Sequence, residues 1–201
     1  MRHWQLLASG VDTMPLMAEI ARQPELWHED TFLRHYPQGP FGDTDSIMLR
    51  FPAQVKVKSD KVRQRYVDNK VAGYDAHDSV FYPPWYRLPA AQNHVFALMQ
   101  VLKGVRLGRV LINRIRPGGE IFPHRDHHIH TSRWRRHHLV LHGHPGAHLF
   151  IGDQESGVEV VSMQTGMLFW FDNREEHRVI NNSDDDRISM VIDIQTCDVV
   201  V

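Results

Sequence analysis

Residues 167–194 read MLFWFDNREEHRVINNSDDDRISMVIDI, and this stretch decides the fold class. It holds three runs rich in apolar, aromatic and β-branched residues, at 167–171, 177–182 and 187–194, separated by polar turns. Runs of this length and composition, bounded by Asn, Asp and Ser, predict β-strands. Because no helical pattern lies between them, we expect antiparallel sheets rather than strand–helix–strand units.

The same pattern extends upstream to about residue 106. Four further runs have strand character and are separated by turns containing Pro or Gly: 108–116, 137–143, 147–152 and 158–162. Many short strands without intervening helices are typical of a sandwich or barrel. We therefore predict a mainly β protein with a core at 106–195. We expect this core to be a cupin-like jelly roll, the double-stranded β-helix.

The N-terminal part, residues 1–105, reads as helices and loops within a single domain that spans 1–201. A helix is expected from Asp12 or Thr13 to about Gln23, because Asp and Thr favour N-caps. The clearest helix runs from Pro89 to Leu102 and is predicted to pack on the outside of a sheet. Its expected apolar stripe is Val95, Phe96, Met99 and Leu102.

The segment 56–84 is polar, charged and without clear periodicity. A long segment without structure is usually functional or mobile, so we interpret it as a candidate lid or substrate loop, with a surface excursion as the alternative. Its basic part, Lys56 to Arg65, would suit an acidic substrate.

The bulk composition fits an ordinary soluble domain. The 201 residues carry a formal net charge of −1, which gives no reason to expect nucleic acid or a membrane as partner. A single cysteine, Cys197, excludes an internal disulfide, and the N-terminus has no apolar signal-like run, so a cytoplasmic location is expected. Unusually, nine of the 15 histidines fall between His124 and His148.

One spacing among these histidines indicates a metal site. In an extended chain, His124 and Asp126 point to the same face and can reach one ion. His177, 53 residues further on at the start of a predicted strand, is the candidate third ligand. Two histidines and one carboxylate leave open positions on iron, as in non-haem Fe(II) oxygenases. By itself His-x-Asp is common, and a solvated pair on a surface strand is the alternative.

Arg187 strengthens this interpretation. If residues 182–186 form a hairpin tip, His177 pairs with about residue 191, and Arg187 lies on the same face ~13 Å along the sheet. A metal-chelated five-carbon diacid spans such a gap, and a guanidinium binds its far carboxylate through two parallel hydrogen bonds. The alternative is that Arg187 neutralises the acidic residues 184–186.

Several words between Asn113 and Asp193 are similar to those of a known family. They are RPGGEIFPHRD (116–126), RHHLVL (136–141), PGAHLFIG (145–152), FDNREEHRVINNS (171–183) and RISMVID (187–193). Together they resemble the aspartyl/asparaginyl β-hydroxylases, which are 2-oxoglutarate oxygenases. The resemblance implies a jelly-roll core that binds Fe(II) and 2-oxoglutarate and uses O2.

The resemblance also implies roles for individual positions. His124 and His177 match the two iron-binding histidines, and Asp126 fills the carboxylate position. Arg187 matches the arginine that binds the far carboxylate of 2-oxoglutarate. Two further matches concern the cosubstrate pocket: Arg136 and His138 near the 1-carboxylate, and Asn113 near the far carboxylate.

We therefore expect a dioxygenase that hydroxylates a carbon of an amino-acid side chain, as an Asp/Asn-type residue in a peptide or as a free amino acid, and releases succinate and CO2. The partner would be a small molecule or a peptide, and the sequence gives no oligomeric state. Two alternatives remain. One is a cupin-type metal-binding protein or isomerase, which would not need Arg187. The other is a binding module that has lost activity, which the complete set of ligands argues against.

Overall fold

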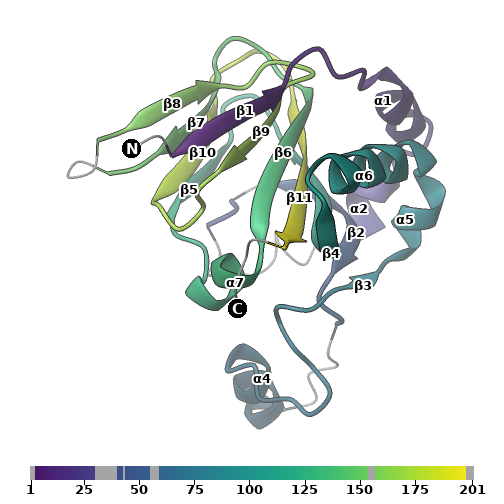
Figure 1. Cartoon of the computed structure of the whole chain (residues 1–201), viewed down its shortest axis with the longest axis vertical. Coiled ribbons are helices and arrows are strands. Elements are labelled where there is room, and N and C mark those ends of the chain that lie inside the picture. The colour runs from purple at the N-terminus through teal and green to yellow at the C-terminus, as the bar shows by residue number, and fades with distance from the viewer. Residues whose placement is uncertain (1–2, 30–39, 43, 55–58, 154–156, 198–201) are drawn as a thin grey trace.

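The structure, a computed structural model, describes residues 3–29, 40–42, 44–54, 59–153 and 157–197. Two antiparallel sheets form the body of the molecule, and helices cover the outer face of the larger one (Figure 1). The larger sheet has the strand order β1-β9-β6-β11-β4-β2-β3, and the smaller has the order β5-β10-β7-β8. The predicted mainly β, jelly-roll class is confirmed.

The strands are β1 (Trp4–Ala8), β2 (Asp45–Phe51), β3 (Val80–Phe81), β4 (Gly104–Ile115), β5 (Glu120–His124), β6 (Arg135–His142), β7 (Ala147–Ile151), β8 (Glu159–Ser162), β9 (Leu168–Phe171), β10 (His177–Asn181) and β11 (Arg187–Thr196). Every run predicted as a strand from residue 108 onward is a strand. The sequence does not predict β1, which pairs with β9 at the edge of the large sheet.

Alternation along β11 separates two environments, as expected for a strand buried on both faces. The residues at even positions of β11, from Ile188 to Ile194, share one face of the strand. They pack with helix residues such as Leu16 and Val95 in one apolar core. Arg187 lies on the opposite face and donates a hydrogen bond to Met163, which belongs to the core between the sheets. The polar residues at odd positions of β11 therefore face the interior of the jelly roll.

The helices on the outer face of the large sheet are α1 (Met14–Ala21), α2 (Leu26–Glu29), α5 (Pro83–Arg87) and α6 (Pro89–Val101). Both predicted helices are present, but the predicted stripe on α6 is wrong at Phe96, which is 53% exposed. The buried face instead follows Ala91, Val95 and Leu98, whose spacing keeps them over the sheet. None of the helices in the described ranges combines the length and the apolar character needed to cross a bilayer.

The segment expected to lack structure, 56–84, is partly ordered. Residues 55–58 lie outside the described residues. Ser59 then caps α4 (Asp60–Val67), which stands clear of the body (Figure 1). Residues 68–79 lead back to β3, which pairs with the end of β2. Apolar periodicity does not predict α4, because this charged helix packs no apolar side against the core.

The hairpin assumed between His177 and Arg187 is wrong. β10 pairs with β5 and β7 in the small sheet, whereas β11 pairs with β4 and β6 in the large sheet. The intervening residues cross from one sheet to the other. The Asn181 side chain fixes this crossing by donating to the backbone oxygens of Ile115 and Asp185, at 2.9 and 2.8 Å. Arg187 thus faces the small sheet from across the interior instead of lying beside His177.

Candidate metal centre and cosubstrate pocket

Antiparallel pairing of β5 and β10 brings two of the predicted ligands together. His124, the last residue of β5, is the register partner of His177, the first residue of β10, and the two rings lie 4.2 Å apart. Asp126 follows two residues after His124. One ligand atom from each of the three residues lies within 4.8 Å of the other two. The donor set predicted from the sequence is therefore assembled at one edge of the small sheet.

Backbone carbonyl groups orient both imidazoles. Nδ1 of His124 donates to the oxygen of Phe122 (2.7 Å), and Nδ1 of His177 donates to the oxygen of Glu175 (2.9 Å). Each ring then presents Nε2 as a free donor atom, as is usual for histidine ligands. Burial, followed by the neighbouring His124, lowers the pKa of His177 to about 4. This ring is neutral at physiological pH and ready to bind a metal.

Two side chains hold the carboxylate of Asp126. Nδ2 of Asn173 donates to Oδ2 at 2.6 Å, and Arg136 also donates to this oxygen. Burial alone would raise the pKa of Asp126, but the Arg136 guanidinium keeps it below its usual value. The other oxygen, Oδ1, lies 3.8 Å from Nε2 of His124, on the side of the metal ligands. The carboxylate is thus charged and aimed before any metal binds.

Arg136, for which the resemblance implies a cosubstrate contact, lies behind Asp126. It makes two parallel hydrogen bonds with the buried Asp193, both 2.9 Å long. Asp193 also accepts a hydrogen bond from Nε2 of His130 at 2.8 Å. Burial opposes ionisation of Asp193, yet Arg136 and His130 hold its pKa well below the usual range. A continuous buried network therefore connects Asp126 with His130 of α7 (His128–Arg133).

Arg187 is 1% exposed, and within the described residues no carboxylate pairs with it. Its guanidinium donates from Nη2 to the sulfur of Met163 at 3.1 Å, and its Nε has no partner among the described residues. Burial lowers the pKa of Arg187 to about 9. A buried guanidinium without a counter-ion is costly, by several kcal/mol. The position therefore fits an anion that the chain itself does not supply.

Further polar atoms without partners lie on the same face of the large sheet. Ser189, two residues along β11, has an unpaired hydroxyl, and neither ring nitrogen of His138 has a partner. His138 stacks on Phe169 at 5.4 Å, and burial lowers its pKa well below the usual value. Asn113, the register partner of Ser189, accepts from the Ser46 hydroxyl at 2.8 Å. These groups fit a polar, carboxylate-bearing cosubstrate better than an apolar core.

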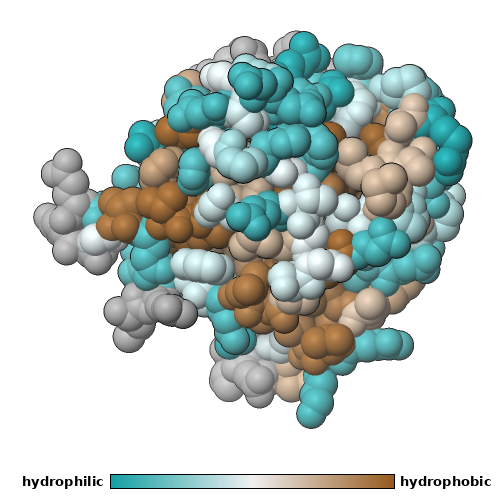
Figure 2. Space-filling model, turned by 90° about the horizontal axis from the view of Figure 1, so that it is seen from above, coloured by the Kyte–Doolittle hydropathy of each residue, from teal (hydrophilic) through white to brown (hydrophobic). Residues whose placement is uncertain are grey.

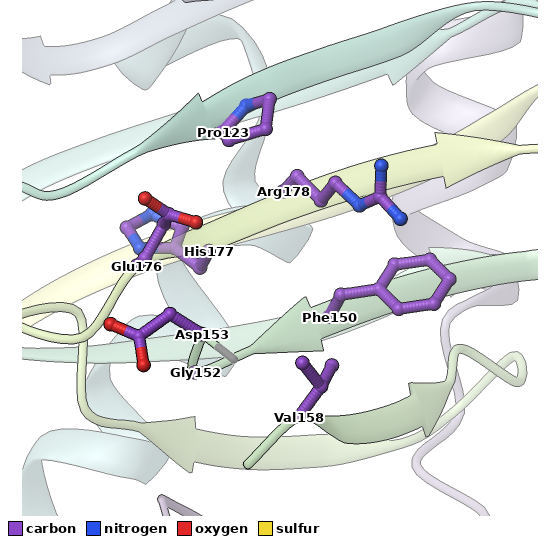
Figure 3. Close-up of a pocket in the computed structure, with 8 residues that line it drawn as sticks. All are labelled: Pro123, Phe150, Gly152, Asp153, Val158, Glu176, His177 and Arg178. Carbon is purple, nitrogen blue, oxygen red and sulfur yellow. The ribbon is translucent and has the colours of Figure 1, made fainter. Parts of the chain in front are cut away.

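The outer face of the small sheet carries a separate hollow of about 260 Å³ (Figure 3). Arg178 and Phe150 lie side by side along it, with the guanidinium carbon 4.7 Å from the ring centroid. Asp153 and Glu176 lie toward its other end, near His177 (Figure 3). Arg178 and Phe150 alternate with residues that point inward, so this hollow opens on the outside of the jelly roll, and His177 lines one end of it.

Sequence reasoning missed two residues of this centre. Asn173 follows β9 and lies 47 residues from its partner Asp126, so neither spacing nor periodicity identifies it. His130 is one of many histidines in its stretch, and nothing local distinguishes it. The word FDNREEH, in which Asn173 precedes His177 by four residues, is the only available signal for Asn173.

The fold and this donor set are those expected of a 2-oxoglutarate-dependent oxygenase with a non-haem Fe(II) site. Residues 49–196 match the family described as Aspartyl/Asparaginyl beta-hydroxylase, and the chain belongs to this family. The family implies Fe(II), 2-oxoglutarate and O2 as cofactor and cosubstrates. No curated protein matched the chain significantly.

Solved structures share the fold at low identity. A prolyl-4-hydroxylase from Pseudomonas putida has a TM-score of 0.54 and 14% identity, covering 98% of this chain and 94% of that one. A 2-oxoglutarate–Fe(II) family oxidoreductase from Burkholderia pseudomallei has a TM-score of 0.56 and 14% identity, covering 96% and 85%. The α-ketoglutarate-dependent epimerase SnoN of nogalamycin biosynthesis has a TM-score of 0.57 and 12% identity, covering 96% and 78%. Hydroxylation and epimerisation thus occur on one fold, so the fold does not specify the reaction.

Proposed function

We propose that this chain hydroxylates a carbon of an amino-acid side chain, free or within a peptide, and converts 2-oxoglutarate to succinate and CO2. One observation carries the proposal. Arg187 is buried without a carboxylate partner in the described structure, on the large sheet, facing the sheet that bears His124 and His177. A cupin-type metal protein or isomerase that does not bind 2-oxoglutarate would have no use for such a charge.

In this proposal His124, Asp126 and His177 hold the iron, and Arg187 binds the far carboxylate of 2-oxoglutarate. O2 would be the oxidant when Fe(II) is bound: one oxygen atom would enter the substrate and the other would enter succinate as 2-oxoglutarate loses CO2. The protein positions the reactants and excludes water. His138, neutral because of its burial, is available to hydrogen-bond the cosubstrate between the iron and Arg187. Arg136 acts through Asp126, which it keeps ionised and oriented.

The substrate side is proposed to lie at residues 69–79, beside α7. Three contacts secure this stretch to the metal end of the molecule. Nε1 of Trp134 donates to the His77 oxygen (3.1 Å), Arg133 pairs with Asp75 (2.8 Å), and the His77 ring lies 5.4 Å from that of His127. These contacts favour a lid or substrate loop over a detached surface excursion, because the stretch borders the residues that follow Asp126.

Arg109 on β4 gives this substrate site a charge. Its Nη2 donates to the Ala76 oxygen at 2.9 Å, whereas its Nε is buried without a partner. Burial, followed by repulsion from Arg136, lowers the pKa of Arg109. As in Arg187, the Nε–H group of Arg109 is therefore available to donate a hydrogen bond to an anion. We assign it to a carboxylate of the amino-acid substrate, as distinct from the carboxylates of 2-oxoglutarate.

The experiment is an anaerobic titration of the metal-free chain with Fe(II) and 2-oxoglutarate. We expect the weak visible metal-to-ligand charge-transfer band of an iron-chelated 2-oxo acid. Exposure to O2 with a panel of free amino acids and short peptides should then release succinate, and the panel member that stimulates release most identifies the substrate class. If the wild-type chain gives neither the band nor succinate, the oxygenase proposal is wrong. If it gives the band and the panel is inert, the substrate assignment is wrong.

A further inference from the structure

A second group of metal-binding side chains lies at the other end of β6 from the iron ligands. His142 is the last residue of β6, His144 follows in the turn to β7, and Asp185 lies in the crossing from β10 to β11. In Figure 1 α7 lies beside the lower end of β6, and the turn from β6 to β7 lies beyond the upper end of this strand. Figure 2 looks onto that end, and hydrophilic side chains cover much of it.

The three donor atoms form a compact triangle. Nε2 of His142 lies 2.9 Å from Nε2 of His144, and the Asp185 Oδ2 atom lies 3.3 Å and 3.6 Å from these two nitrogens. For Zn(II), ligand bonds of about 2.0–2.2 Å in a tetrahedron put neighbouring donor atoms about 3.3–3.6 Å apart. The two edges that end at Asp185 therefore match a coordination tetrahedron, and the edge between the two histidines, at 2.9 Å, has to lengthen by about 0.4 Å when an ion binds. Hydrogen bonding accounts for the shorter contacts only, since 3.6 Å is too long for a hydrogen bond.

Backbone contacts hold the two histidines in this arrangement. The Gly143 N–H between them donates to the Thr165 hydroxyl (3.0 Å), which in turn donates to the Gly143 oxygen (3.2 Å). A Cβ at position 143 would lie 2.0 Å from the Met163 oxygen, so only glycine permits this close approach. The turn is therefore fixed against β8 and the residues that follow it.

The carboxylate is held equally well. Oδ1 of Asp185 accepts from the N–H of Asp186 (2.7 Å), which leaves Oδ2 directed at the two rings. The backbone oxygen of Asp185 accepts from Asn181 (2.8 Å) and from the Ser183 hydroxyl (3.0 Å). The backbone at Gly143 and the carboxylate of Asp185 are thus held by contacts outside the triangle, while the two imidazole rings are held by contacts with each other and with Asp185.

We propose that His142, His144 and Asp185 bind a divalent ion of the borderline class, with Zn(II) as its representative and water completing the coordination. The ion links the turn after β6 with Asp185, which lies in the crossing two residues before Arg187. The site is open, with Asp185 63% exposed, so its role is to stabilise this end of the jelly roll. It is independent of the iron and does not rest on the proposed reaction.

The test is the number of Zn(II) ions bound per chain, measured by equilibrium dialysis and elemental analysis on protein without a histidine tag. The wild type should bind two. The variant His124→Ala/His177→Ala should retain one, and His142→Ala/His144→Ala should likewise retain one. The matched control is His148→Ala, a nearby histidine outside the triangle, which should still bind two.

Thermal unfolding gives a second readout. Zn(II) should raise the Tm of the His124→Ala/His177→Ala chain, and adding Asp185→Asn should abolish most of that rise and weaken Zn(II) binding at least tenfold. The proposal is overturned if the wild type binds a single ion that the folded His124→Ala/His177→Ala chain loses. It is equally overturned if the second ion survives His142→Ala/His144→Ala, because the ion then lies elsewhere.

Discussion

Replacing Arg187 by methionine should have opposite effects on cosubstrate binding and on the stability of the empty protein. Methionine keeps most of the volume and removes the charge. Removing one partner of a buried charge pair costs about 3–5 kcal/mol, and each 1.4 kcal/mol is tenfold in affinity, so the Kd for 2-oxoglutarate should rise by roughly two to three and a half orders of magnitude. Iron binding should change little, because Arg187 touches none of the three ligands.

The empty protein should become more stable. Burial lowers the pKa of Arg187 to about 9, which means that the folded chain holds this charge at a cost. Relieving it should add on the order of 1–4 kcal/mol, the range seen when buried ionic groups are replaced by apolar ones. In a chain of 201 residues each kcal/mol corresponds to roughly 2–4 °C in Tm.

The assays are anaerobic calorimetric titration of 2-oxoglutarate into the Mn(II)-loaded chain and thermal unfolding of the metal-free chain. Arg178→Met is the control, because Arg178 lies on the outer face of the small sheet over Phe150 and should alter neither quantity much. A variant Arg187→Met that binds 2-oxoglutarate as tightly as the wild type would refute the assigned role. One that is less stable without ligand would refute the claim that the charge is unpaired.

Three further predictions follow from the same contacts. Asn173→Ala should weaken Fe(II) binding about 10- to 100-fold in an anaerobic titration, because Asp126 loses a hydrogen-bond donor that orients it. The neighbouring variant Arg174→Ala should bind Fe(II) as the wild type does. Equal Fe(II) affinities of the two variants would contradict the role of Asn173. Burial lowers the pKa of His137 to about 4, so its contribution to stability is complete above pH 6.5 and falls by up to about 3 kcal/mol as the pH drops to 4. In urea unfolding, the free energy of unfolding of His137→Gln should therefore fall less between pH 7 and pH 4.5 than that of the wild type. Equal pH dependence in the two proteins would contradict this prediction. Arg109→Gln should raise the KM for the amino-acid substrate at least tenfold and leave the 2-oxoglutarate Kd unchanged; an unaltered KM would remove Arg109 from the substrate site.

The strands and the three proposed ligands were accessible from the sequence because the signals are local. Alternation and turn residues mark each strand, and the spacing of His124 and Asp126 places both on one face. The pairing of strands is not local. A turn such as 182–186 looks the same whether it closes a hairpin or crosses between sheets, and the Asn181 side chain that fixes the crossing gives no periodic signal.

The sequence prediction that Arg187 binds the far carboxylate of 2-oxoglutarate assumed a hairpin between His177 and Arg187, which the structure does not contain. Ten residues separate it from His177, and this spacing suits a hairpin and a crossing equally well. In the structure Arg187 faces the small sheet, which bears His124 and His177, so its assigned role stays a prediction that does not depend on the hairpin. Asn173 and His130 are different, because their partners are 47 and 63 residues away, and only the folded chain brings them together.

The division of these groups between the two sheets has a physical consequence. His124 and His177 belong to the small sheet, whereas Arg187 and Ser189 belong to the large sheet. The large sheet is held on its outer face by the helices, while the outer face of the small sheet carries an open hollow (Figures 1 and 3). In the proposed complex 2-oxoglutarate therefore joins a well-supported sheet to a less supported one. One end of the cosubstrate would neutralise the iron on the small sheet, and the other end would neutralise Arg187 on the large sheet. Binding should therefore stabilise the contact between the two sheets, which the unpaired charge of Arg187 otherwise destabilises.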